Sequence, residues 1–154
     1  MIRRVSADAA EFADPPRRFE AGTPPIGAAI GLGAAIHWME TLDWPAVAER
    51  ARMQTQRVLD ALAGMQGVRI VGPHTTKNRT GVISFTVAGM TSEEICRSMD
   101  RYDVALRHGH HCAQPLMLAL GLEGTARVSL APYVSDDDID AFIAGLDEVT
   151  RATK

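Results

Sequence analysis

The sequence predicts an α+β domain, in which an antiparallel sheet of about four strands has helices packed on one side. Two observations lead to this fold class. Helical patterns cover residues 26–40, 43–64 and 91–101, and a further helix closes the chain. Four short runs of strand-like composition lie between the second helix and the last one, at residues 68–71, 81–87, 103–106 and 125–130.

Composition is that of a globular protein of one-domain size. The chain has 154 residues, of which 46% are apolar and 23% are charged, so it is long enough to bury a core. Its net charge is only -3, and the arginines are scattered along the sequence. We therefore expect neither nucleic acid nor a membrane among its partners.

The cysteines and the N-terminus indicate a cytoplasmic protein. Two cysteines, Cys96 and Cys112, are too few for a disulfide framework, and a cysteine beside histidines is typical of an intracellular thiol. Residues 1–5 lack the apolar core of a signal peptide, and no run of about 18 apolar residues follows. Export and membrane insertion are both disfavoured.

An extended arm and a sharp turn are expected before the first helix. Residues 1–18 show no clear periodicity, and residues 19–25 contain a glycine and two prolines. Thr23 is placed to cap the helix that begins near Ile26, although Gly-Thr before a helix can also form an anion site. Three glycines in this helix predict close approach to another backbone, and hence burial.

The later helices have clear start signals. Asp43 begins a long amphipathic helix that ends near Gly64. Residues 91–94 form a capping box, residues 115–120 a short helix, and residues 135–138 cap a final helix with one apolar face.

Residues 107–117 carry the strongest chemical signal in the chain. The first six, Arg-His-Gly-His-His-Cys, combine a cation, three histidines and a thiol between a strand-like run and a short helix. Three explanations are open: the thiol is a nucleophile tuned by its neighbours, the cluster binds a metal, or its residues satisfy one another in a polar loop. An arbitrary cysteine is more often a buried structural thiol. Here the nucleophile is preferred, because several donors favour a thiolate at Cys112, namely Arg107, His108, His110 and His111.

Other candidates are weaker. Zinc would suit a thiolate with imidazoles, but adjacent residues rarely point to one centre and no ligand pair has the usual spacing, so we predict no metal site. Cys96 lies within a predicted helix and is interpreted as structural. Arg127, in the last strand-like run, either faces solvent or forks a carboxylate, and both interpretations stay open.

Five stretches resemble the C-terminal part of Suf-type (group II) cysteine desulfurases and selenocysteine lyases. They are Arg-Phe-Glu-Ala-Gly-Thr-Pro at 18–24, Gly-Leu-Gly-Ala-Ala at 31–35, Gly-Val-Ile-Ser-Phe at 81–85, Arg-x-Gly-His-His-Cys-Ala-Gln-Pro-Leu-Met at 107–117 and Thr-Ala-Arg-Val-Ser at 125–129. Members of this family are class V aminotransferase-like enzymes that use pyridoxal phosphate (PLP). The resemblance covers nearly the whole chain.

The resemblance implies a fold and an activity. The fold is the small C-terminal domain of a fold-type-I PLP enzyme at residues 27–154, including the long connecting helix, after an interface arm and cofactor-phosphate turn at residues 1–26. The activity takes sulfur from L-cysteine, with L-selenocysteine as the other substrate. The Cys112 thiolate attacks the substrate sulfur, alanine leaves, and the persulfide passes its sulfur to an acceptor protein, for iron–sulfur cluster assembly or other sulfur transfer.

The resemblance also assigns residue roles. The nucleophile is Cys112. The other site residues are Arg107 and Arg127 for the substrate, Gly22 and Thr23 at the PLP phosphate across a dimer interface, and His110 and His111 in the active-site loop, with electrostatic or proton-handling roles.

One departure from the family is large. The Schiff-base lysine, the histidine that stacks on the cofactor and the cofactor aspartate have no counterparts here, and neither Lys77 nor Lys154 stands in a matching motif. We expect the chain alone not to hold PLP covalently, and to need a homodimer or a companion chain that supplies the cofactor domain. The alternative is a catalytically incomplete module that pairs with a full desulfurase or a sulfur acceptor. A smaller departure is Glu93 and Glu94, where many relatives carry histidines.

Overall fold

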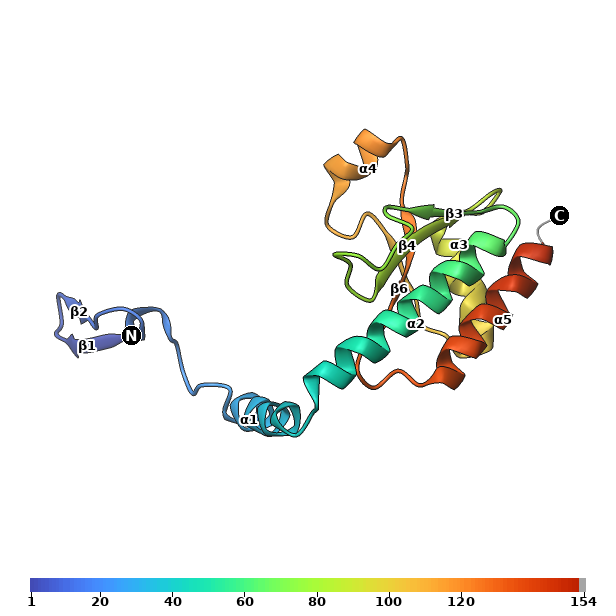
Figure 1. Cartoon of the computed structure of the whole chain (residues 1–154). Helices are drawn as coiled ribbons and strands as arrows, with labels where there is room; N and C mark the ends of the chain where they lie inside the picture. The colour runs from blue at the N-terminus through green and yellow to red at the C-terminus, as the bar shows by residue number, and fades with distance from the viewer. Residues whose placement is uncertain (153–154) are drawn as a thin grey trace. The chain divides into compact units, whose positions relative to one another are not determined.

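The computed structural model describes residues 1–152 and contains two compact units, Met1–Asp43 and a second unit that begins at Trp44. The elements of the first unit are β1 (Ile2–Val5), β2 (Ala10–Phe12), the 3₁₀ helix η1 (Arg17–Phe19) and α1 (Ile26–Glu40) (Figure 1). The elements of the second unit are α2 (Trp44–Gly64), β3 (Val68–Val71), β4 (Val82–Val87), α3 (Ser92–Met99), the 3₁₀ helix η2 (Asp100–Tyr102), β5 (Arg107–Gly109), α4 (Gln114–Leu120), β6 (Thr125–Ser129) and α5 (Asp136–Ala152).

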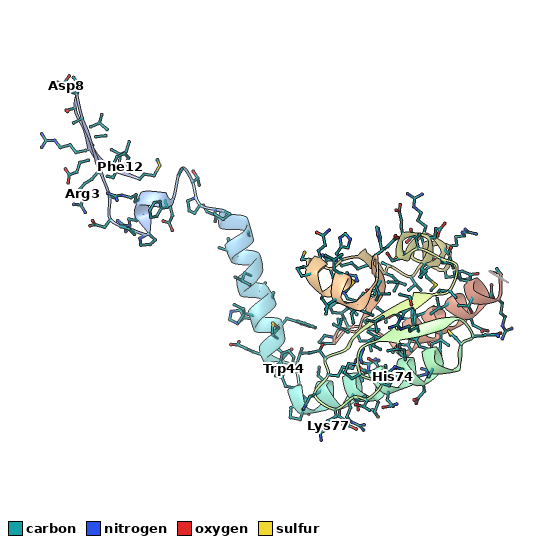
Figure 2. All side chains as sticks on the ribbon, turned by 90° about the horizontal axis from the view of Figure 1, so that it is seen from above. Arg3, Asp8, Phe12, Trp44, His74 and Lys77 are labelled. Atoms are coloured by element: carbon teal, nitrogen blue, oxygen red, sulfur yellow. The ribbon has the colours of Figure 1, made fainter. Side chains whose placement is uncertain are left out.

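The first residues form a β-hairpin, where an extended arm rather than an independent element was expected. β1 and β2 pair antiparallel, and Figure 2 shows Asp8 at the tip of the hairpin, with Arg3 and Phe12 on its strands. The Arg3 guanidinium lies 3.5 Å from the Glu11 carboxylate and 2.8 Å from that of Asp14. The prediction failed because both strands are short and exposed throughout, so no buried face imposes an apolar alternation on the sequence.

Helix α1 forms as predicted, but none of its residues is buried. Its exposed large apolar side chains are Ile26, Ile30, Leu32, Ile36, Trp38 and Met39. A Cβ added at any of its glycines would meet no atom within 4 Å, so the expected close backbone approach is absent among the described residues. The expected cap is also wrong, because the N-cap position is Pro25 and no side chain caps the helix. A helix that is apolar on all sides needs other protein around it.

The second unit contains the predicted four-stranded antiparallel sheet, with strand order β3–β4–β6–β5. Along β4 the buried residues alternate with less buried ones, so one face of the sheet carries the core. Helices α2, α3 and α5 pack on that face (Figure 1), and the Phe85 ring from β4 meets the Phe142 ring from α5 edge-on at 6.1 Å. The predicted α+β class, with helices on one side, is confirmed.

The third predicted strand is displaced along the chain. Residues 103–106 were expected to form it, but β5 begins only at Arg107. Asp103 takes a left-handed conformation (φ 57°) that ends η2, and Val104 and Leu106 are half-buried against the core without joining the ladder. The apolar alternation at residues 103–106 therefore reflects side-chain packing against the core. The strand β5 is formed by the first three residues of the polar cluster.

Two predicted caps are present in detail. The Thr91 hydroxyl accepts from the Glu94 amide at 3.2 Å, while the Glu94 carboxylate accepts from the Thr91 amide at 2.8 Å. The same reciprocal pair joins Ser135 and Asp138 at the start of α5. Within residues 1–152, no helix combines the length and the apolar character needed to cross a bilayer.

Gly145 is the position in α5 where a side chain should cost the most. A Cβ there would lie 2.8 Å from Cγ of Tyr102, whose hydroxyl donates to Glu148 at 2.9 Å and so holds the ring. We expect Gly145→Ala to lower the free energy of unfolding by about 1–2 kcal/mol, since the overpacking exceeds the gain in helix propensity. Urea unfolding followed by circular dichroism measures this. Gly64→Ala, where the added methyl meets open space, is the matched control and should not destabilise.

Candidate active site

Two arginines face each other on the sheet surface that the core helices leave uncovered. In the ladder between β5 and β6, Arg107 lies directly opposite Arg127. Ala126, the neighbour of Arg127, is completely buried in the core, so alternation along the strand puts both arginines on the opposite face. Like charges directly opposite each other are unfavourable. Such a pair becomes favourable when an anion lies between the guanidinium groups.

Arg127 is only partly accessible, which bears on the two interpretations of its sequence position. Its side chain is half-buried, and its Nε atom is buried with no hydrogen-bond partner within residues 1–152. A solvent-facing arginine would have its donors in water. The orphaned donor fits an anionic group such as a substrate carboxylate.

The loop after β5 is held in an unusual backbone conformation. Gly109 has φ +99°, and the non-glycine residues His111 and Cys112 follow with φ 54° and 61°. The Ala113 amide donates to the His110 carbonyl at 2.9 Å and closes a tight turn. Consecutive left-handed residues other than glycine are rare and are often found at functional sites.

His111 is anchored to the first residue of β6. Its Nε2 atom lies 3.0 Å from the carbonyl oxygen of Thr125 and 2.9 Å from the Thr125 hydroxyl. Because a carbonyl oxygen only accepts, Nε2 carries the hydrogen and Nδ1 does not. Nδ1 is buried and has no partner among the described residues. His111 is thus fixed as one tautomer.

The surroundings keep His111 neutral. Burial lowers the pKa of His111 below its usual value, and this effect exceeds that of the hydrogen bond to the Thr125 carbonyl, which raises the pKa. The nearby positive charges of Arg127, Arg107 and His108 also lower the pKa. A neutral imidazole with a free Nδ1 lone pair can accept a proton or a hydrogen bond.

This shift predicts a pH dependence of stability. Since the pKa of His111 is lower in the folded chain than the ordinary 6.5, the unfolded chain binds the proton first on acidification. The stabilising contribution is therefore present above about pH 6.5 and is lost below it. We expect the unfolding free energy to fall less between pH 7.5 and 5.5 in His111→Gln than in the wild type, measured by urea unfolding. His74→Gln, which removes an exposed histidine, is the matched control.

The thiol of Cys112 is accessible and has a cation beside it. Nη2 of Arg107 donates toward the Cys112 sulfur at 3.7 Å, and Cys112 is exposed. Cys96 differs in both respects, because it is buried in α3 and burial raises its pKa to about 11. A thiol is a nucleophile as its thiolate, so Cys112 is the cysteine suited to chemistry.

The structure brings four of the predicted site residues together, namely Arg107, His111, Cys112 and Arg127. His110 is exposed in the same turn. Gly22 and Thr23 belong to the first unit, in the turn before α1, and their role stays a prediction. His108 lies opposite Ala126 in the ladder, hence on the other face of the strand from Arg107. There it lines a cavity of about 580 Å³ beside the start of α3.

Sequence reasoning missed Thr125. It is completely buried and binds His111 through both its hydroxyl and its carbonyl. A period of two along the strand puts Thr125 on the same face as Arg127, which is the signal that could have pointed to it. Among residues 1–152, no three His, Cys, Asp or Glu side chains are grouped so that they could hold a metal ion.

Comparisons with known proteins identify the family of this chain. Residues 1–142 match the family model "Aminotransferase class-V". A probable cysteine desulfurase of Streptomyces coelicolor is 36% identical over 97% of this chain and 36% of its own length. The cysteine desulfurase of Dickeya dadantii is 39% identical over 98% of this chain and 36% of its own length. The chain thus spans a little over a third of the length of these curated relatives.

A solved structure of a cysteine desulfurase is also similar to this chain. The apo cysteine desulfurase of Thermococcus onnurineus is 35% identical and superposes with a TM-score of 0.84, covering 98% of this chain and 38% of that one. This similarity supports the small-domain fold of a PLP enzyme. Together with the family match over most of the sequence, it shows that the chain belongs to the class-V aminotransferase family.

Proposed function

We propose that this chain is the persulfide-forming C-terminal portion of a Suf-type cysteine desulfurase. The observation that carries the proposal is the exposed Cys112 sulfur 3.7 Å from the Arg107 guanidinium, on a loop beside Arg127. A thiol with a cation beside it can act as the nucleophile, and a guanidinium with an unpartnered Nε can bind the carboxylate of an amino acid; both are groups that this chain would contribute to taking sulfur from cysteine. The curated relatives of this chain are named cysteine desulfurases.

In the proposed reaction Arg127, with Arg107 beside it, binds the carboxylate of L-cysteine or L-selenocysteine. The Cys112 thiolate forms a bond to the substrate sulfur as the Cβ–S bond of the substrate breaks. The carbon takes up a proton, and alanine is released. Neutral His111 accepts or relays a proton within the loop, and His110 adds to the loop's electrostatics.

PLP supplies the electron sink that allows the Cβ–S bond to break. The residues present fit only part of this cofactor. Gly22 has φ +75°, with open space around it, and Thr23 is exposed, which suits a turn that approaches a phosphate. Lys77 is exposed in the loop between β3 and β4, on the surface of the second unit (Figure 2), and no resemblance assigns it to the cofactor.

A partner therefore supplies most of the PLP site, as a companion chain or as the remainder of a homodimeric enzyme. The exposed apolar surface of α1 supports this, because an all-round apolar helix requires covering protein. We place the assembly in the cytoplasm, where it delivers sulfur to an acceptor protein for iron–sulfur cluster assembly or other sulfur transfer. The second candidate function, a catalytically incomplete interaction module, is favoured by the same exposed surface.

Reconstitution separates the two functions. The chain is purified alone and with the protein encoded next to it, and each sample receives PLP and L-cysteine. We expect alanine release, and a persulfide on Cys112 by mass spectrometry, only in the mixture. Tight binding to the neighbour without alanine or persulfide would contradict the desulfurase proposal and leave the interaction module.

A further inference from the structure

Thr125 makes a contact that the proposed reaction does not use. It is completely buried at the start of β6, yet two of its oxygen atoms, the hydroxyl and the carbonyl, converge on Nε2 of His111. His111 immediately precedes Cys112. A side-chain hydroxyl on the sheet is therefore one residue removed from the exposed thiol.

We propose that Thr125 is a positioning residue for Cys112: by holding His111 against the sheet, its hydroxyl keeps the Cys112 sulfur beside the Arg107 guanidinium. The role of this placement in persulfide formation rests on the proposed function. The placement itself does not, and it can be measured without substrate or PLP.

The local backbone shows why an anchor is needed. The ladder pairs Gly109 with Thr125, and the chain then leaves the sheet through residues with left-handed φ at His111 and Cys112. Residues with a Cβ adopt this conformation only where the surroundings enforce it. Two sets of contacts hold these residues: the bonds of His111 to Thr125, and the 3.7 Å contact of Cys112 with Arg107.

Because Nε2 of His111 carries the hydrogen, the two acceptors that Thr125 offers can be separated by substitution. Nε2 donates to the Thr125 carbonyl, which any residue at 125 would keep, and shares its hydrogen with the hydroxyl at 2.9 Å, which only threonine or serine can offer. Thr125→Val removes the second acceptor and nearly preserves shape. Thr125→Ser restores it.

The test measures the charge felt by the Cys112 sulfur. Each variant is alkylated with anionic iodoacetate and with neutral iodoacetamide at low salt, and modification of Cys112 is read by peptide mass spectrometry. Both reagents react with the thiolate, so the thiolate fraction cancels when the iodoacetate rate is divided by the iodoacetamide rate. Because only iodoacetate is charged, this ratio rises when a cation lies near the sulfur. A guanidinium at this distance should raise the ratio about three- to fivefold over that of Arg107→Met, the reference without the charge.

We expect Thr125→Val to lower the ratio to near the Arg107→Met value, and Thr125→Ser to keep the wild-type ratio. Thr125→Val added to Arg107→Met should change nothing further, because both act through one contact. His111→Phe removes the same hydrogen bonds by replacing the donor, so it should lower the ratio in the same way. It replaces Thr125→Val in the test if that variant does not fold. Thr150→Val is the control, since it removes another buried hydroxyl bond, 2.9 Å to the Asp147 carbonyl, in α5.

A wild-type ratio in folded Thr125→Val or in His111→Phe would overturn the proposal. So would a lowered ratio in Thr125→Ser, because the hydroxyl would then not be the acting group. A lowered ratio in Thr150→Val would mean that general loosening is being measured, and would overturn it as well. If the wild-type chain in its assembled form makes no persulfide while these ratios are as expected, the result counts against the proposed function alone.

Discussion

Cys112→Ser is expected to abolish persulfide formation in the assembled enzyme and to reduce alanine release by about a thousandfold or more, the scale on which loss of a nucleophile acts. The serine hydroxyl occupies the same exposed position beside Arg107, but it is not ionised at neutral pH and forms no persulfide. The measurements are alanine release from L-cysteine and the mass of the peptide that contains residue 112.

Cys96→Ser is the matched control for this prediction. Cys96 is buried in α3, and its raised pKa of about 11 keeps it as a thiol. Its replacement should cost stability and leave alanine release per folded enzyme near the wild-type value. Sulfide release that survives in Cys112→Ser would show that Cys112 is not the nucleophile.

Arg127→Gln is expected to raise KM for L-cysteine by about a hundredfold, since it removes a charge-assisted, two-pronged contact to a carboxylate. The half-buried position of Arg127 and its orphaned Nε make this loss larger than that of a surface arginine. Arg127→Lys keeps the charge without the fork and should recover only part of the affinity. Steady-state kinetics of the assembled enzyme separate KM from kcat.

Arg79→Lys controls for the loss of a half-buried guanidinium. Arg79 also has a buried, unpartnered Nε, but its other nitrogens donate to the carbonyls of Pro73 and Val82 and so hold the loop before β4. This variant should be less stable with an unchanged KM. If KM in Arg127→Gln stays within about twofold of the wild type, the substrate carboxylate binds elsewhere.

The fold class was predictable because it depends on local sequence patterns, which most of the helices and strands in the second unit carry. The capping box at Thr91 and the apolar face of α5 each predict a helix from nearby residues, and the alternation of β4 predicts a strand. The hairpin at the N-terminus and the strand at 107–109 were missed because they lack such local patterns. Whether these residues form strands depends on the strands they pair with, and a short stretch of sequence does not show its pairing partner.

The candidate site divides in a similar way. The sequence by itself determined that the cluster at 107–112 is chemically unusual, that Cys112 is its thiol, and that the motifs resemble those of cysteine desulfurases. Only the tertiary structure decided that Arg107 faces Arg127, that His108 points to the other side, and that Thr125 holds His111. These relations depend on strand register and on a left-handed turn. Both follow from contacts between residues far apart in the chain, so no local pattern contains them.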